Sequence, residues 1–222
     1  MDVLPQASLF LGIIPALLLL YIVLKGYEGM YKDKTVFLTF VVGIILGFIA
    51  AVVRSFTLPG MIAYIVLLAF FEQLLKTIVL NMRRFQRKQE TTIYGLSLGL
   101  GFGSVFTPFL IVAGSASIVG DTTAFAAVAA GSLGIILFHA AIGVFIGYGI
   151  YEGKLLKFLF IAIGLQLPFN ALMDWSRFYP NVYFFYAQLA LILYGLFVFW
   201  YVVKKVMPQL LVKGKKRKRS NT

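Results

Sequence analysis

The sequence predicts an all-α, polytopic membrane protein: a bundle of seven transmembrane helices with the N-terminus outside and the C-terminus cytoplasmic. Hydrophobic residues make up 61% of the 222 residues, and the mean hydropathy is +0.93. Both values lie far above those of a soluble domain. Seven apolar stretches can be drawn, each close to the roughly 20 residues that cross a hydrocarbon core. Basic residues between these stretches gather on alternate sides, as expected for helices that cross back and forth.

The seven stretches are 4–24, 35–53, 58–80, 91–113, 123–150, 156–176 and 183–206. No basic residue precedes the first stretch and no small-residue cleavage site follows it, so we expect it to be retained as a helix. Pro108 and Gly114 are expected to kink or end the fourth stretch. The fifth is long enough to tilt or protrude. We therefore predict a transmembrane domain over 1–207 and a basic cytoplasmic tail over 208–222.

The distribution of lysine and arginine predicts the orientation. Of the 20 basic residues, 17 follow the first, third, fifth and seventh stretches. Arg54 and Arg177 fall on the other side, and Lys76 lies within a stretch. Cytoplasmic loops are rich in lysine and arginine, so we expect the segments that follow the first, third, fifth and seventh stretches to lie in the cytoplasm. The protein would then be a multi-pass protein of the cell membrane.

The net charge of +12 and the absence of cysteine limit the chemistry. In a membrane protein, basic residues serve orientation and attraction to anionic lipid, so we expect no nucleic-acid partner. The run from Lys213 to Arg219 is expected to contact anionic lipids of the bilayer. Without cysteine there is no disulfide, thiol nucleophile or cysteine-bound metal.

Glycines predict where helices pack closely. Gly95, Gly99 and Gly103 repeat every four residues in the fourth stretch, and Gly143 and Gly147 do so in the fifth. Small residues at this spacing form a smooth face on which another helix can approach closely in lipid.

Five ionisable or amide residues lie in or near the apolar stretches: Glu72, Lys76, His139, Asn170 and Asp174. Ionisable groups at membrane depth are costly, about 2.5–3.5 kcal/mol each on insertion scales, and commonly mark functional sites. A rise of 1.5 Å per residue puts Glu72, His139 and Asn170 at depths of roughly 12, 16 and 21 Å from the cytoplasmic ends of their helices. We therefore predict that Glu72 and His139 meet and that Asn170 approaches from the outer side.

Structural roles are also open for these residues. Glu72 and Lys76, one turn apart, could form an ion pair within their helix. His139 could be a hydrogen-bonded residue of the bundle core, and Asp174 could lie at the outer interface.

The motifs resemble those of PrsW-type intramembrane proteases, which belong with the CAAX prenyl endopeptidases and the anterior-pharynx-defective subunit of γ-secretase. Phe71-Glu72-Gln73-Leu-Leu-Lys76 is similar to their Glu-Glu-x-x-Lys motif, and Tyr94 opens a similar glycine-rich helix. Phe138-His139-Ala-Ala-Ile-Gly143 is similar to the histidine helix, and Asn170-Ala-Leu-Met-Asp174 to the last motif. The resemblance covers a motif-bearing core of about 58–178.

The sequence departs from that family at three motif positions. Gln73 replaces the second glutamate, Phe106 stands where an acidic residue is expected, and Asn170 replaces a histidine. The resemblance implies that Glu72 activates a water, that His139 orients it and that Asn170 steadies an oxyanion. It implies supporting roles for Gln73, Lys76, Tyr94 and Asp174.

Three functions follow as hypotheses. The first is a glutamate-type intramembrane endopeptidase acting on a membrane-bound peptide or protein. The second is a non-catalytic homologue that serves as a membrane scaffold or partner-binding subunit. The third is a carrier of a small solute or ion. We expect no cofactor, because the single histidine rules out a zinc site of two histidines and a carboxylate and leaves mostly oxygen ligands for any metal.

Overall fold

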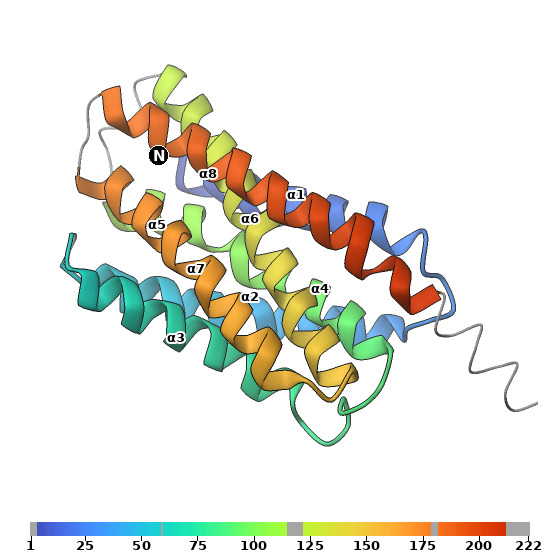
Figure 1. The fold of residues 1–222 in the computed structure, drawn as a ribbon. Helices are drawn as coiled ribbons and strands as arrows, with labels where there is room; N and C mark the ends of the chain where they lie inside the picture. Colours follow the sequence, from blue (N-terminus) through green and yellow to red (C-terminus); the bar gives the residue numbers. More distant parts are fainter. Residues whose placement is uncertain (1–3, 59, 115–121, 179–181, 212–222) are drawn as a thin grey trace, which may run out of the picture.

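A computed structural model describes residues 4–58, 60–114, 122–178 and 182–211, and these form helices joined by short connections. No strand occurs within those ranges. The helices, coloured along the chain in Figure 1, are α1 (Leu4–Leu24), α2 (Asp33–Ser55), α3 (Ile62–Leu80), α4 (Glu90–Ser104), α5 (Phe106–Gly114), α6 (Thr122–Tyr151), α7 (Leu155–Phe178), α8 (Val182–Tyr201) and the π-helical turn η1 (Val202–Val206).

Five helices are long and apolar enough to cross a membrane, so the structure is all-helical where it is described and consistent with the predicted helical membrane protein. They are Asp33–Ser55, Ile62–Leu80, Thr122–Tyr151, Leu155–Ser176 and Tyr183–Leu211. α1 contains a shorter apolar helical stretch, Phe10–Leu24. Each predicted stretch corresponds to helix in the structure. The fourth is divided into α4 and α5, and the seventh continues from α8 into the π-helical turn η1. The polybasic run Lys213–Arg219 lies outside the described residues.

The division of the fourth stretch has a local cause in Pro108. Proline has no N–H, so a continuous helix would leave the carbonyl of Ser104 without its usual donor. The helix instead stops at Ser104 and restarts as α5 at Phe106. The expected break therefore occurs one turn before the proline, and α5 is described as far as Gly114, so the predicted end at that glycine is not tested.

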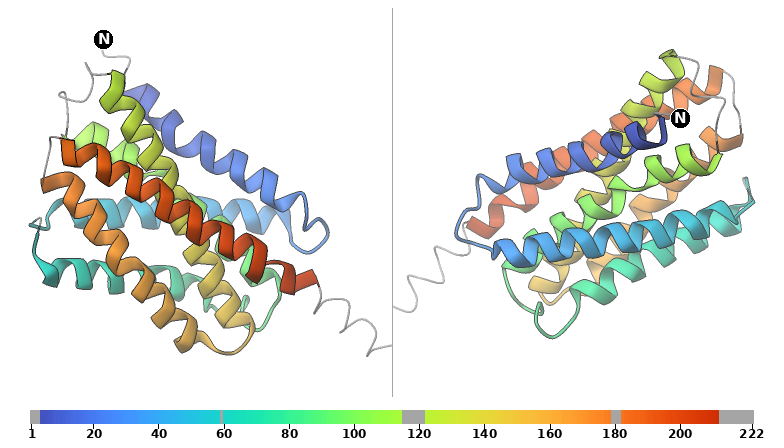
Figure 2. Two further views of the ribbon diagram at one scale, coloured as in Figure 1. Left: turned by 45° about the horizontal axis from the view of Figure 1, so that its top comes forward. Right: turned by 180° about the vertical axis from the view of Figure 1, so that it is seen from behind.

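The core of the bundle is formed by α4 and α6. Every residue from Thr91 to Ser104 in α4 is buried, as is every residue of α6 from Ile135 to Ile150. Figure 2 shows α6 crossing the bundle obliquely, with the other helices arranged around it. These two helices therefore lack the polar outer face of a soluble bundle, as expected for the interior of a membrane protein.

The predicted glycine faces lie in the contact between α4 and α6. A methyl group added at Gly95 would collide with the Gly143 carbonyl, and one at Gly99 with the His139 carbonyl. Gly147 approaches the backbone of Thr91 in the same way, and Gly103 that of Ile136. The backbones are thus close enough that no side chain fits between them, which is how small residues drive helix association in lipid.

The connections gather at two ends of the bundle. At one end, the Lys32 N–H donates to the Tyr94 hydroxyl over 3.2 Å, and the Gln89 side chain donates to the Leu210 carbonyl. The α1–α2 and α3–α4 connections and the end of the last helix therefore lie together, and the α6–α7 turn is on the same side (Figure 1). The α2–α3 connection lies at the opposite end.

Replacing Gly99 with alanine should destabilise the bundle, because its new methyl group would meet the His139 backbone. Overpacking of this kind costs about 1–3 kcal/mol. The matched control is Gly164→Ala in α7, where a methyl group meets nothing within 4 Å. Thermal unfolding in detergent should show a loss for Gly99→Ala and no loss for Gly164→Ala, and equal behaviour of the two would contradict the tight contact.

Candidate functional site

One face of α3 carries the polar residues of the candidate site. Glu72, Gln73 and Lys76 are all fully buried in the bundle, with exposed fractions of 0%. Leu67 and Ile78, on the opposite face, are exposed by 62% and 68%. The helix is therefore amphipathic in the sense of a membrane protein, with its apolar face outward and its costly polar groups inward.

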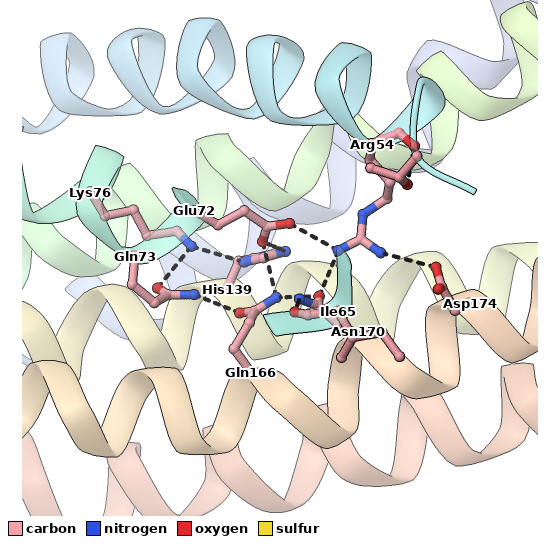
Figure 3. A network of polar contacts seen from close by, with 10 residues as sticks. Arg54, Ile65, Glu72, Gln73, Lys76, His139, Gln166, Asn170 and Asp174 are labelled. Atoms are coloured by element: carbon pink, nitrogen blue, oxygen red, sulfur yellow. Dashed lines mark hydrogen bonds and ion pairs between the residues drawn. The ribbon is translucent and has the colours of Figure 1, made fainter. Parts of the chain in front are cut away.

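Polar residues on α7 recur every four positions and so share one helix face. They are Gln166, Asn170 and Asp174, and all three are buried. Trp175, one residue after the last of them, is 49% exposed. The α7 face thus meets the polar face of α3 inside the bundle (Figure 3).

Arg54, in the last turn of α2, reaches between these two faces. Its guanidinium Nη2 lies 2.9 Å from Glu72 Oε1 and 2.5 Å from Asn170 Oδ1. Its Nη1 lies 3.9 Å from Asp174 Oδ1. The side chain is only 1% exposed, so this arginine forms buried ion pairs that join α2, α3 and α7.

Two amide side chains complete the surroundings of Glu72. Gln166 Nε2 donates to Glu72 Oε2 over 2.9 Å and to Asn170 Oδ1 over 2.8 Å. Gln73 Nε2 donates to Gln166 Oε1 over 2.7 Å. Both carboxylate oxygens of Glu72 therefore accept a hydrogen bond from a fixed side chain.

Lys76 does not pair with Glu72, the partner one turn away that the sequence suggested. Its Nζ donates to Gln73 Oε1 over 3.2 Å, lies 3.2 Å from His139 Nδ1 and sits 3.9 Å from the centre of the Phe102 ring. The ammonium thus has two polar neighbours and one aromatic face, the arrangement that lowers the cost of burying a lysine.

His139, on α6, is enclosed by aromatic rings. The Phe106 ring stacks on the imidazole with 5.2 Å between centroids, and the Phe102 and Phe169 rings lie at 4.8 and 5.8 Å. His139 Nε2 is 3.9 Å from Glu72 Oε2. Phe106, which stands at the sequence position where the resemblance implied an acidic residue, therefore packs against His139.

These side chains form a single polar network across four helices. We define the polar network as Arg54, Glu72, Gln73, Lys76, His139, Gln166, Asn170 and Asp174. It holds two basic side chains and two carboxylates, so the positive and negative groups balance when the histidine is neutral. Balance and mutual hydrogen bonding are the conditions under which buried charges are tolerated.

The structure brings together the three residues to which catalytic roles were assigned: Glu72, His139 and Asn170 (Figure 3). Gln73, Lys76 and Asp174 join them. Tyr94 does not, because its hydroxyl accepts the Lys32 N–H at the end of the bundle. The amide of Asn170 also binds the backbone of α3, because its Nδ2 donates to the Ile65 carbonyl over 3.1 Å.

Sequence reasoning missed two members of the network, Arg54 and Gln166. Arg54 was assigned to the flank outside the membrane because it closes an apolar stretch. Gln166 precedes Asn170 by four residues, the spacing of the last family motif, and an isolated glutamine in an apolar helix was the signal that could have found it. Gln166 donates directly to Glu72, whereas Asn170 and Asp174 reach it through Arg54.

Within the described residues, no three histidine, cysteine, aspartate or glutamate side chains come close enough to hold a metal ion. The chain also matches no protein-family model, no curated protein and no solved structure.

The ion pair between Arg54 and Glu72 should contribute strongly to stability. Arg54→Gln leaves the Glu72 carboxylate buried without its nearest cation, and breaking a buried pair in this way costs about 3–5 kcal/mol. Arg83→Gln, at an exposed arginine, is the control and should stay within about 0.5 kcal/mol. Unfolding of the purified variants in detergent measures both, and an unchanged Arg54→Gln protein would show that the pair does not support the fold.

Proposed function

We propose that the chain crosses the cell membrane seven times, with the N-terminus outside and the C-terminus in the cytoplasm. α4 and α5 together make the fourth crossing, as the two halves of one broken helix. The grouping of the α1–α2, α3–α4 and α6–α7 connections with the end of the last helix supports this topology. The basic residues of that end then face the cytoplasm.

We further propose that the polar network makes this protein a non-catalytic membrane scaffold or partner-binding subunit related in design to intramembrane proteases. The observation that carries this proposal is the enclosure of Glu72, which is fully buried and has a donor on each carboxylate oxygen. A glutamate that activates water must reach that water and a substrate carbonyl together. Here Arg54 and Gln166 occupy the positions from which such a water would be held.

Gln73, which stands where the resembled motif has its second glutamate, supports the same proposal. An amide in place of the second glutamate cannot act as an acid or a base, but it can join hydrogen bonds in both directions. Gln73 does so, accepting from Lys76 and donating to Gln166. The residues that replace the family's catalytic groups therefore serve to connect α3 with α7.

A glutamate-type endopeptidase is the second candidate. It is favoured by the convergence of Glu72, His139 and Asn170 from three helices, with 3.9 Å between Glu72 Oε2 and His139 Nε2. In that function, movement of the Arg54 side chain would open Glu72 to water and to a membrane-bound peptide.

The lipid bilayer is the environment proposed for either function. Anionic lipid is the partner proposed for the basic tail and for the basic residues at the same end of the bundle. Arg83, Arg84, Arg87 and Lys88 lie in the α3–α4 connection, on the side assigned to the cytoplasm. Each basic residue near an anionic surface contributes about 1 kcal/mol of attraction.

Single cysteines test the topology, because the natural chain has none. A membrane-impermeant maleimide added to intact cells should label Phe56→Cys, whose native side chain is 82% exposed in the α2–α3 connection. It should leave Met82→Cys and Leu211→Cys unlabelled until the cells are opened. Labelling of only one of these last two would mean an odd number of crossings between them and would contradict seven spans.

Cleavage measurements separate the two functions. The purified protein, reconstituted in liposomes with a panel of single-span membrane peptides, should yield no fragments beyond those of empty liposomes. Glu72→Gln should change the melting temperature and leave the fragment pattern unchanged, because the network supports folding and not hydrolysis. Mass spectrometry of the peptides gives the readout.

The control is Glu28→Gln, which removes an exposed carboxylate. Fragments made by the natural protein and by Glu28→Gln, but lost in Glu72→Gln at a temperature where that variant is folded, would contradict the scaffold proposal and establish the endopeptidase.

A further inference from the structure

His139 has a feature that a purely structural role does not explain. It is the only histidine in the chain and is fully buried. Its Nε2 atom has no hydrogen-bond partner among the described residues. Buried polar atoms are normally satisfied, and exceptions call for a physical reason.

The contact with Lys76 relates the position of the imidazole proton to the charge of the lysine. Lys76 Nζ lies 3.2 Å from His139 Nδ1, and an ammonium group can only donate. With Lys76 as the ammonium, Nδ1 accepts, and a neutral ring then carries its proton on Nε2. The second contact of Nζ, with Gln73 Oε1 at 3.2 Å, is also a donation.

The protonated Nε2 lies across from the Glu72 carboxylate. Its distance of 3.9 Å from Glu72 Oε2 is too long for a hydrogen bond. A shift of about 1 Å would bring it to hydrogen-bonding distance. A proton donor, an imidazole and a carboxylate thus follow one another, each within reach of the next.

We propose that Lys76, His139 and Glu72 form a proton relay inside the bundle. A proton passes from Lys76 Nζ to His139 Nδ1, while the proton on Nε2 passes to Glu72 Oε2. One N–H bond breaks and one forms on the imidazole, which stays neutral. The products are a neutral lysine amine, the other histidine tautomer and a glutamic acid, and no electrons are gained or lost.

The relay exchanges a form of the network in which Lys76 and Glu72 are both charged for one in which both are neutral. In the charged form, Glu72 is the anion that faces Arg54. In the neutral form, Arg54 retains Asp174 as its anionic neighbour, at 3.9 Å. Transfer of the proton therefore weakens the link between α2 and α3 and leaves the link between α2 and α7.

The surroundings leave few competing proton acceptors for the imidazole. The rings that α4, α5 and α7 bring against it belong to Phe102, Phe106 and Phe169, which do not ionise. The charged groups facing it come from α3, as Lys76 and Glu72, with Arg54 of α2 beyond them.

Nitrogen NMR of the protein in liposomes tests the relay, because ¹⁵N-histidine labelling reports on one ring only. We expect the Nε2–H tautomer to predominate and to exchange with the Nδ1–H tautomer, seen as temperature-dependent averaging of the two ring signals. Glu72→Gln should abolish the exchange, because an amide does not take up the proton. Lys76→Met should abolish it as well, and Lys157→Met, at an exposed lysine, should retain it.

The natural protein alone can overturn the proposal, even if the buried variants fail to fold. A ring protonated at both nitrogens, or a single static tautomer at all temperatures, would exclude the relay. Exchange that persists in Glu72→Gln would exclude Glu72 as the acceptor. The result is independent of the scaffold proposal, which fails on peptide cleavage and not on the state of the imidazole.

Discussion

The ion pair between Arg54 and Glu72 is the interaction on which the interior of this bundle depends. Both side chains are almost completely buried, and removing either charge from water is expensive unless the other is held close in good geometry. The pair fixes the end of α2 against the middle of α3. Asn170 and Gln166 then have defined positions, because each hydrogen-bonds to a member of the pair.

Packing and polarity have separate roles in this architecture. Lipid tails are as apolar as leucine, so hydrophobic burial does not distinguish one helix pairing from another inside a membrane. Close backbone contact at Gly95 and Gly99 joins α4 to α6. The polar network joins α3 and α7 to that core and to α2 through groups that have no acceptable alternative partner in lipid. α8 contributes no residue to the polar network, and its exposed side chains are aromatic and aliphatic.

Much of the fold was predictable because apolar length and glycine spacing are local properties of the sequence. The convergence of Glu72 and His139 was also predictable, since distance along a helix gives depth. Depth does not give direction around the helix axis, and so the sequence suggested Lys76 as the partner of Glu72. In the structure the partner of Glu72 is Arg54. Arg54 comes from α2, and the sequence does not show which way α2 faces relative to α3. Gln166 was missed for the same reason, because only packing turns its amide toward Glu72.

An experimental structure of the protein in a lipid nanodisc, at a resolution that defines the Arg54 guanidinium, is the decisive measurement. If the enclosed network is correct, Arg54 Nη2 and Glu72 Oε1 will lie within hydrogen-bonding distance, with Gln166 on the second oxygen. An Arg54 side chain turned toward the outer solvent, with Glu72 facing a water-filled cavity, would contradict the enclosed network and with it the non-catalytic function.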